Sequence, residues 1–293
     1  MQKTIIYTLL RFFALMPLPL NHRIGAWLGS LLYFLKGKPY QIARKNLQLC
    51  FPELGPEALQ QRLKLSLQEL GKQLTEMGPM WLWPPEKTLS LLTHISGKEH
   101  MDAAMKAGKG VFLLTPHLGC WEIAGLYLEA NIPVTILYAR PKIKALDDIV
   151  RASRIRSGAT LVAADASGVK TIFKALKQGK GTGILPDQNP DEANSGVFAP
   201  FFGIETFTMS FIAKMASKTG ANIVIGYAER LPGGQGYHLH IHQADPDIGN
   251  SDPLISATAL NKTIENFIRE TPEQYQWSYK RFKKRPPGET RFY

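Results

Sequence analysis

The chain of 293 residues contains only two cysteines, Cys50 and Cys120. Two cysteines cannot build the disulfide framework of a small secreted domain, so we expect the catalytic part to lie in the reducing cytoplasm. Acidic residues are also scarce, because 24 Asp and Glu stand against 35 Lys and Arg and give a formal net charge of +11. This excess favours an anionic partner such as a nucleic acid, a membrane surface or an acidic protein, and composition alone does not choose among them.

Neither apolar block near the N-terminus reaches the roughly 20 residues that a membrane-spanning helix needs. Residues 4–20 are apolar except for Arg11, and residues 24–35 form a second apolar block. No convincing signal-peptide cleavage site follows the first block. We therefore predict that residues 1–38 form an uncleaved membrane anchor, either interfacial helices or one imperfect transmembrane helix. The alternative is a pair of buried amphipathic helices in a soluble domain.

Four basic residues follow the anchor: Lys36, Lys38, Arg44 and Lys45. Basic residues directly beyond an apolar segment are typical of the cytoplasmic side of a membrane, where they meet anionic lipids. The sequence thus predicts a protein on the cytoplasmic side of a membrane, with an anionic membrane surface as one partner.

Residues 39–293 are predicted to form one α/β domain. After a helix at 57–77, helical patterns at 99–107, 120–130, 144–156 and 168–178 alternate with apolar segments at 111–115, 133–139, 159–164 and 181–186. Continuous apolar strands alternating with helices predict a mostly parallel central sheet flanked by helices. The remaining expectations are a long loop at 187–205, a helix at 207–219, a hairpin of strands 222–230 and 236–243, and a helix at 254–270.

The segment TPHLGCWE (115–122) lies where a buried strand is expected to end and a helix to begin. Reactive groups gather at the carboxyl ends of strands in open α/β sheets. If Glu122 bends back to His117, its carboxylate fixes the imidazole tautomer and makes the other ring nitrogen a stronger base toward a hydroxyl. The alternative is a histidine that caps the helix beside a solvated helical glutamate.

Within this segment, HLGCWE resembles the H-x-x-x-x-[DE] motif of the lysophospholipid acyltransferase superfamily. Five further blocks are similar, in the same order, to motifs of the lipid A biosynthesis late acyltransferases, the lauroyl and myristoyl transferases. These blocks are YARP (138–141), RIRSG (154–158), LPDQN (185–189), VFAPFFG (197–203) and PEQYQWSYKRFKKRPPGE (272–289).

The resemblance implies an enzyme of lipopolysaccharide biosynthesis. It would transfer an acyl chain from an acyl carrier protein thioester to a hydroxyl of a Kdo-bearing lipid A precursor. It assigns His117 as the general base and Glu122 as its orienting partner, and Arg154, Arg156 and Asp187 match further motif positions. No metal and no organic cofactor is implied.

The expected substrates explain why basic residues are needed. Attack on a thioester builds negative charge on the carbonyl oxygen, and the acceptor carries phosphates and acidic sugars that guanidinium groups bind well. Arg140, Arg154 and Arg156 are candidates for either task, with a solvated basic helix face as the alternative. Asp187 and Gln188 follow a predicted strand and are expected at the edge of the substrate site, unless Asp187 merely caps a turn.

Three competing signals lead to other classes of site. His238, His240 and His242 share one face of a strand, but three imidazoles at this spacing spread over roughly 13 Å, too far for one zinc ion. Cys120 is a possible nucleophile with a neighbouring histidine as base. The basic tail, residues 280–291, is not accompanied by a recognised nucleic-acid motif, so we expect no nucleic acid partner.

The hypotheses left open beside the lead are a glycerophospholipid acyltransferase acting on a lysophosphatidate, a lipid hydrolase, and a non-catalytic lipid-binding protein. A hydrolase would release free fatty acid without an acceptor, and a binding protein would keep its function without the histidine base.

Overall fold

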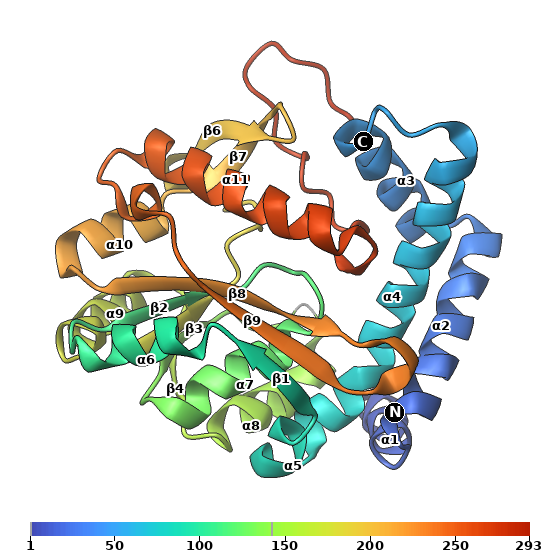
Figure 1. The fold of residues 1–293 in the computed structure, drawn as a ribbon, viewed down its shortest axis with the longest axis horizontal. Helices are drawn as coiled ribbons and strands as arrows, with labels where there is room; N and C mark the ends of the chain where they lie inside the picture. The colour runs from blue at the N-terminus through green and yellow to red at the C-terminus, as the bar shows by residue number, and fades with distance from the viewer. Residues whose placement is uncertain (1, 142) are drawn as a thin grey trace.

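The computed structural model describes residues 2–141 and 143–293 (Figure 1). Its helices are α1 (Gln2–Ala14), α2 (Leu18–Leu35), α3 (Lys38–Cys50), α4 (Pro56–Leu82), α5 (Pro85–Leu89), α6 (Lys98–Lys106), α7 (Trp121–Asn131), α8 (Asp147–Ile155), α9 (Ala166–Lys177), α10 (Phe211–Thr219) and α11 (Pro253–Glu270). Its strands are β1 (Leu92–Ser96), β2 (Val111–Leu114), β3 (Thr135–Tyr138), β4 (Thr160–Ala163), β5 (Gly181–Ile184), β6 (Gly196–Phe201), β7 (Ile204–Met209), β8 (Asn222–Arg230) and β9 (Tyr237–Gln243).

The central sheet has the strand order β1-β9-β8-β2-β5, and only the β8–β9 pair in it is antiparallel. Strand β2 shows why its sequence is continuously apolar. Phe112 and Leu114 pack into the core on the α11 side, and Val111 and Leu113 into the core on the α7 side. A strand covered on both faces has no solvent side to alternate with. The predicted α/β class with a mostly parallel sheet and flanking helices is confirmed.

The predicted loop at 187–205 is wrong in its second half. Strands β6 and β7 form an antiparallel hairpin there, in which Gly196 pairs with Met209 and Phe201 with Ile204. Residues 207–209, predicted as the start of a helix, belong to β7. The segment IETFTM contains three β-branched residues, Ile204, Thr206 and Thr208, so it fits a pleated strand better than a helix.

Helices α1 and α2 lie beside α4 at the right of Figure 1. Close approach of α2 to α4 depends on glycines, because a Cβ on Gly71 would lie 1.9 Å from the carbonyl oxygen of Gly25 and one on Gly29 would lie 2.1 Å from that of Leu67. The predicted end of the anchor, residue 38, falls at the first residue of α3. Among the residues that the structure describes, no helix combines the length and the apolarity needed to cross a bilayer.

A buried ion pair joins the N-terminal helices to the sheet. The Glu76 carboxylate of α4 accepts hydrogen bonds from Arg230 Nε of β8 at 2.9 Å and from the Tyr237 hydroxyl of β9 at 2.9 Å, and its Oε2 lies 3.3 Å from His22 Nε2 of α2. Burial alone raises the pKa of Glu76, but the charge of Arg230 and the hydrogen bonds from His22 and Arg230 outweigh it and lower this pKa to about 2.

Replacing Arg230 with Met is expected to lower the free energy of unfolding by about 3–5 kcal/mol, because it leaves the Glu76 carboxylate buried without its cation. Urea unfolding at neutral pH measures this loss. Lys98→Met is the matched control, since it breaks the exposed pair with Asp102 and is expected to cost less than about 1 kcal/mol. Equal losses in both variants would contradict the account.

The same pair predicts an acid-side loss of stability in the wild type. The pKa of Glu76 in the folded chain, about 2, lies below its ordinary 4.5, so the stability that Glu76 contributes is complete above pH 4.5 and is lost as the pH falls toward 2. In Arg230→Met the cation that lowers this pKa is absent, so the loss on acidification is expected to be smaller.

Candidate active site

His117 lies in the loop between β2 and α7, at the carboxyl edge of the sheet. Strand β8 holds this loop from one side, because the backbone N–H of Cys120 donates to the carbonyl of Ala228 at 2.8 Å. Gly119 has a φ of +61°, and a Cβ there would lie 2.0 Å from the oxygen of the same Ala228 carbonyl. Only glycine permits this approach. Gly119 and its contact with β8 therefore fix the backbone of the loop that carries His117.

The C-terminal segment holds the same loop from the other side. Gln276 N–H donates to the His117 carbonyl at 2.9 Å, and Gly119 N–H donates to the Gln274 carbonyl at 3.1 Å. The Gln274 side chain in turn exchanges two hydrogen bonds with the backbone of Arg230, at 2.8 and 3.0 Å. The block PEQYQW therefore belongs to the site as the support of the histidine loop.

The imidazole of His117 is fixed by a buried aspartate. Its Nδ1 lies 2.7 Å from Asp187 Oδ1, and its backbone N–H donates to Asp187 Oδ2 at 2.9 Å. The two residues are only 6% and 2% exposed. Burial by itself raises the pKa of Asp187, but the charge and the hydrogen bonds of His117 lower it overall, so Asp187 is an anion at neutral pH. A carboxylate can only accept, so in the neutral imidazole Nδ1 carries the proton and Nε2 has the lone pair.

The free nitrogen of that ring faces an exposed side chain. Gln188 Nε2 lies 3.1 Å from His117 Nε2 and donates to it, and Gln188 itself is exposed. The indole of Trp121 meets the imidazole edge to face with ring centroids 4.7 Å apart. His117 Nε2 therefore faces a side chain that lies at the surface.

The partner that sequence analysis expected for His117 is wrong. Glu122 lies in the first turn of α7, where Oε1 accepts from Arg154 Nη2 at 2.7 Å and Oε2 accepts from Trp81 Nε1 at 3.0 Å. Both oxygens of Glu122 are thus used by α8 and α4, and the bond to the imidazole comes from Asp187 instead. In the first turn of α7, the Glu122 side chain is directed to Arg154 and Trp81 and not to the imidazole.

The three predicted arginines lie in different surroundings. Arg154 pairs with Glu122, whereas the Arg156 guanidinium donates through Nη2 to the Met80 carbonyl, and its buried Nε has no partner among the described residues. Arg140 is exposed beyond β3 and makes no hydrogen bond or ion pair with a described residue. Arg154 and Arg156 thus lie where α4, α7 and α8 meet, which we call the α4–α7–α8 corner. Arg140 makes none of these contacts.

Sequence reasoning missed two members of this corner. Trp81 of α4 donates to Glu122, and the buried carboxylate of Glu129 accepts from the Ser157 hydroxyl. Burial raises the pKa of Glu129 despite that hydrogen bond and the nearby charge of Arg154. No local pattern connects Trp81 with Glu122, because the two residues are 41 positions apart.

Cys120 is unsuited to the role of nucleophile. It is 1% exposed at the start of α7, and burial raises the pKa of its thiol well above the ordinary value. A thiol, not a thiolate, is therefore present at neutral pH.

Asp187 is in turn supported by the C-terminal segment. Its neighbour Asn189 donates through its side chain to the Arg281 carbonyl at 2.8 Å and through its backbone to the Tyr279 hydroxyl at 2.9 Å. Arg281 is buried and donates to the Phe207 carbonyl at 2.8 Å. Part of the basic tail thus has a structural task and presents no charge to an outside partner.

A buried histidine–aspartate pair thus lies at the carboxyl edge of a mostly parallel sheet, where reactive groups gather in α/β proteins. The profile of the bacterial lipid A biosynthesis acyltransferase family matches residues 3–284, and the chain belongs to this family. It is therefore an acyltransferase, and the resemblance seen in the sequence is confirmed.

Similar curated proteins bear related names. The lipid A biosynthesis lauroyltransferase of Escherichia coli K12 is 31% identical over 93% of this chain and 88% of its own length. The palmitoleoyltransferase of the same organism is 29% identical over 95% of this chain and 90% of its own. Its myristoyltransferase is 25% identical over 94% of this chain and 83% of its own.

Proposed function

We propose that this protein transfers a fatty acyl chain from an acyl carrier protein thioester to a hydroxyl of a Kdo-bearing lipid A precursor. The observation that carries the proposal is the His117 ring, whose Nδ1 is bonded to buried Asp187 while Nε2 points to an exposed side chain. The family and the names of its similar members support late acylation of lipid A.

The reaction follows from the direction of the lone pair. His117 Nε2 takes the proton of the acceptor hydroxyl, and the oxygen attacks the thioester carbonyl. The new C–O bond forms as the C–S bond breaks, and the imidazolium returns the proton to the departing thiolate. Asp187 keeps the ring in one tautomer and stabilises its cation. Because Gln188 occupies Nε2 at 3.1 Å, the acceptor hydroxyl has to replace that amide.

Glu122 enters this proposal as a positioning residue. It holds Arg154 at 2.7 Å, and it directly follows Trp121, the indole that packs against the His117 ring. Arg154 would then stabilise charge near the thioester, and Arg156 and Arg140 would bind the anionic groups of the acceptor.

The arginine roles predict unequal kinetic effects. Arg154→Lys is expected to lower kcat and Arg156→Lys to raise KM for the acceptor, each by about tenfold or more, because an ammonium cannot reproduce the guanidinium fork. The exposed Arg151 of α8 supplies the control, and Arg151→Lys is expected to stay near wild type. Steady-state kinetics with an acyl carrier protein thioester as donor measures this. Identical effects of the two substitutions would refute the assigned division of tasks.

The exposed face of α1 and α2 supports docking on a lipid surface. Large apolar side chains stay in solvent along it, at 42–85% exposure: Ile5, Tyr7, Leu9, Phe12, Leu15, Leu20, Trp27, Leu31, Phe34 and Leu35. So many large apolar side chains in solvent on the two N-terminal helices indicate an interaction site. We place it in the cytoplasmic leaflet of the inner membrane, with the basic residues beyond α2 attracted to anionic headgroups.

Two substitutions on this face test the placement without deleting helices that pack on α4. Trp27→Ser with Phe34→Ser is expected to lower the partition coefficient to anionic vesicles at least tenfold, since burying each of these side chains is worth about 1.5–3 kcal/mol. Sedimentation with vesicles in high salt measures it. Leu254→Ser, on exposed Leu254 of α11, is the control and is expected to change nothing. Unchanged binding of the double variant would place the lipid-binding surface elsewhere.

The function itself is tested by mass spectrometry of lipids from cells with and without the protein. We expect lipid A that lacks one acyl chain when the protein is absent. A change confined to glycerophospholipids would favour a lysophosphatidate acceptor instead.

A further inference from the structure

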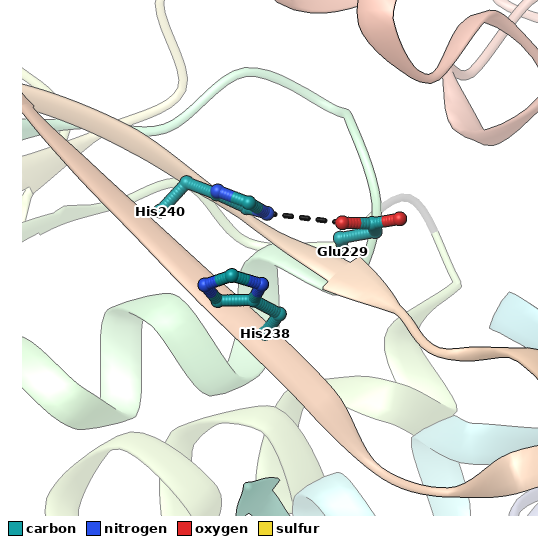
Figure 2. A group of neighbouring side chains, drawn as sticks. All are labelled: Glu229, His238 and His240. Atoms are coloured by element: carbon teal, nitrogen blue, oxygen red, sulfur yellow. Dashed lines mark hydrogen bonds and ion pairs between the residues drawn. The ribbon is translucent and has the colours of Figure 1, made fainter. Parts of the chain in front are cut away.

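Two histidines and a glutamate lie together on the hairpin of β8 and β9, outside the acyl-transfer site (Figure 2). In the antiparallel register Glu229 pairs with His238, and His240 follows two residues later on the same face. One ligand atom from each of the three side chains lies within 4.8 Å of the other two. His240 Nε2 is 3.0 Å from Glu229 Oε2, and the rings of His238 and His240 have centroids 3.8 Å apart.

This grouping differs from the one that the sequence presented. Three histidines in one strand would spread too far for one ion, and His242 does turn away to pack on Phe267, with ring centroids 4.9 Å apart. The third member comes from the neighbouring strand, as Glu229. Residues i and i+2 of one strand share a face of the sheet, and the residue opposite them on the next strand shares it too. Three such side chains can therefore meet at one point.

We propose that Glu229, His238 and His240 form a binding site for a divalent transition-metal ion, with zinc as the best-suited ion. Two imidazoles and one carboxylate are a ligand set that zinc accepts, with the fourth position left for water. Tetrahedral bonds of about 2.0–2.1 Å bring ligand atoms to about 3.3 Å from one another. The three atoms would therefore have to approach one another by up to about 1.5 Å, which half-buried side chains can do by rotating.

A neighbouring hydroxyl prepares one of the ligands. Ser96 Oγ of β1 lies 2.7 Å from His238 Nε2, which leaves Nδ1 of this ring for the ion. A hydrogen bond to the far nitrogen of a ligating histidine fixes its orientation.

An ion here would act on the fold, because Glu229 lies between two residues that hold the histidine loop. Ala228 accepts from Cys120 N–H, and Arg230 exchanges hydrogen bonds with Gln274. Joining β8 to β9 at Glu229 would stabilise the folded chain by mass action. The inference rests on this geometry and is independent of the acyl acceptor.

The test uses the full-length chain freed of metal with a chelator and titrated with zinc chloride. Calorimetry is expected to show one ion per chain, and thermal unfolding is expected to shift upward with zinc. His238→Asn and Glu229→Gln are each expected to weaken binding at least tenfold and to remove the shift. The matched control is His242→Asn, in the same strand and on the same face but outside the group, which is expected to bind zinc as the wild type does.

Cobalt gives a second readout that does not depend on stability. Its visible spectrum is expected to lack the thiolate charge-transfer band that either cysteine would give, and to disappear in His238→Asn. Circular dichroism verifies that each variant is folded. His238→Asn and Glu229→Gln are separate tests, so either one can contradict the proposal if the other fails to fold. The proposal is overturned if the wild type binds no stoichiometric ion, or if the ligand variants bind zinc as tightly as His242→Asn does.

Discussion

His117→Ala is expected to lower acyl transfer by about 10²–10⁴-fold, the usual contribution of a general base. The two nearby carboxylates cannot replace the histidine as base, because Asp187 is buried and Glu122 is paired with Arg154. The loss should lie in kcat, since the ring acts on the proton transferred in the reaction and not on the rest of the lipid.

The fold is expected to survive this change. The His117 loop is held by its backbone, through Gln276, Gly119 and Cys120, and the alanine keeps all of these contacts. Circular dichroism and the urea midpoint verify this, so that lost activity reports chemistry. A variant that keeps more than about half of the wild-type activity would show that transfer does not need a base at this position.

Asp187→Asn is expected to lower transfer nearly as much, by about 10²–10⁴-fold. Asp187 accepts from two donors of His117, the backbone N–H and Nδ1–H. An asparagine has only one oxygen, so its amide N–H₂ must face one of the two donors. If it faces the ring, the proton moves to Nε2 and the lone pair that should accept the hydroxyl proton is lost.

Glu122→Gln provides the matched comparison, because Glu122 is a second nearby carboxylate but is hydrogen-bonded to Arg154 and Trp81 instead of the imidazole. We expect it to act through Arg154, so that Glu122→Gln and Arg154→Met together cost no more than the larger of the two alone. Nitrogen NMR of the imidazole separates the roles, since only Asp187→Asn should move the proton between ring nitrogens. A changed tautomer in Glu122→Gln, with none in Asp187→Asn, would restore Glu122 as the partner.

Much of the fold can be predicted from periodicity. The apolar segments at 111–115, 133–139, 159–164 and 181–186 contain β2 to β5, and the turn at Pro232 to Gly234 does join β8 to β9. Local patterns mark these elements: a short apolar segment for each of the four strands, and turn residues for the β8–β9 hairpin. The β6–β7 hairpin is harder to predict, because Gly196 and Pro200 interrupt the strand pattern of β6. They are tolerated there because the hairpin is a separate two-stranded sheet.

The partner of His117 could not be predicted from spacing, because it depends on strand order. Strand β5 lies next to β2 in parallel, with Val111 opposite Gly181, so the residues that follow the two strands meet at one edge. His117 and Asp187 are 70 positions apart and come together only through this pairing. Glu122 was the nearer carboxylate in sequence, but helix geometry turns it toward Arg154.

One assay tests most directly which acceptor the protein acylates. The purified protein is supplied with an acyl carrier protein thioester and, in separate reactions, with a Kdo-bearing lipid A precursor or with lysophosphatidate, and His117→Ala serves as the blank. The account predicts a precursor heavier by one acyl chain, no comparable product from lysophosphatidate, and no free fatty acid in excess of the blank. Strong turnover of lysophosphatidate with none of the lipid A precursor would contradict it.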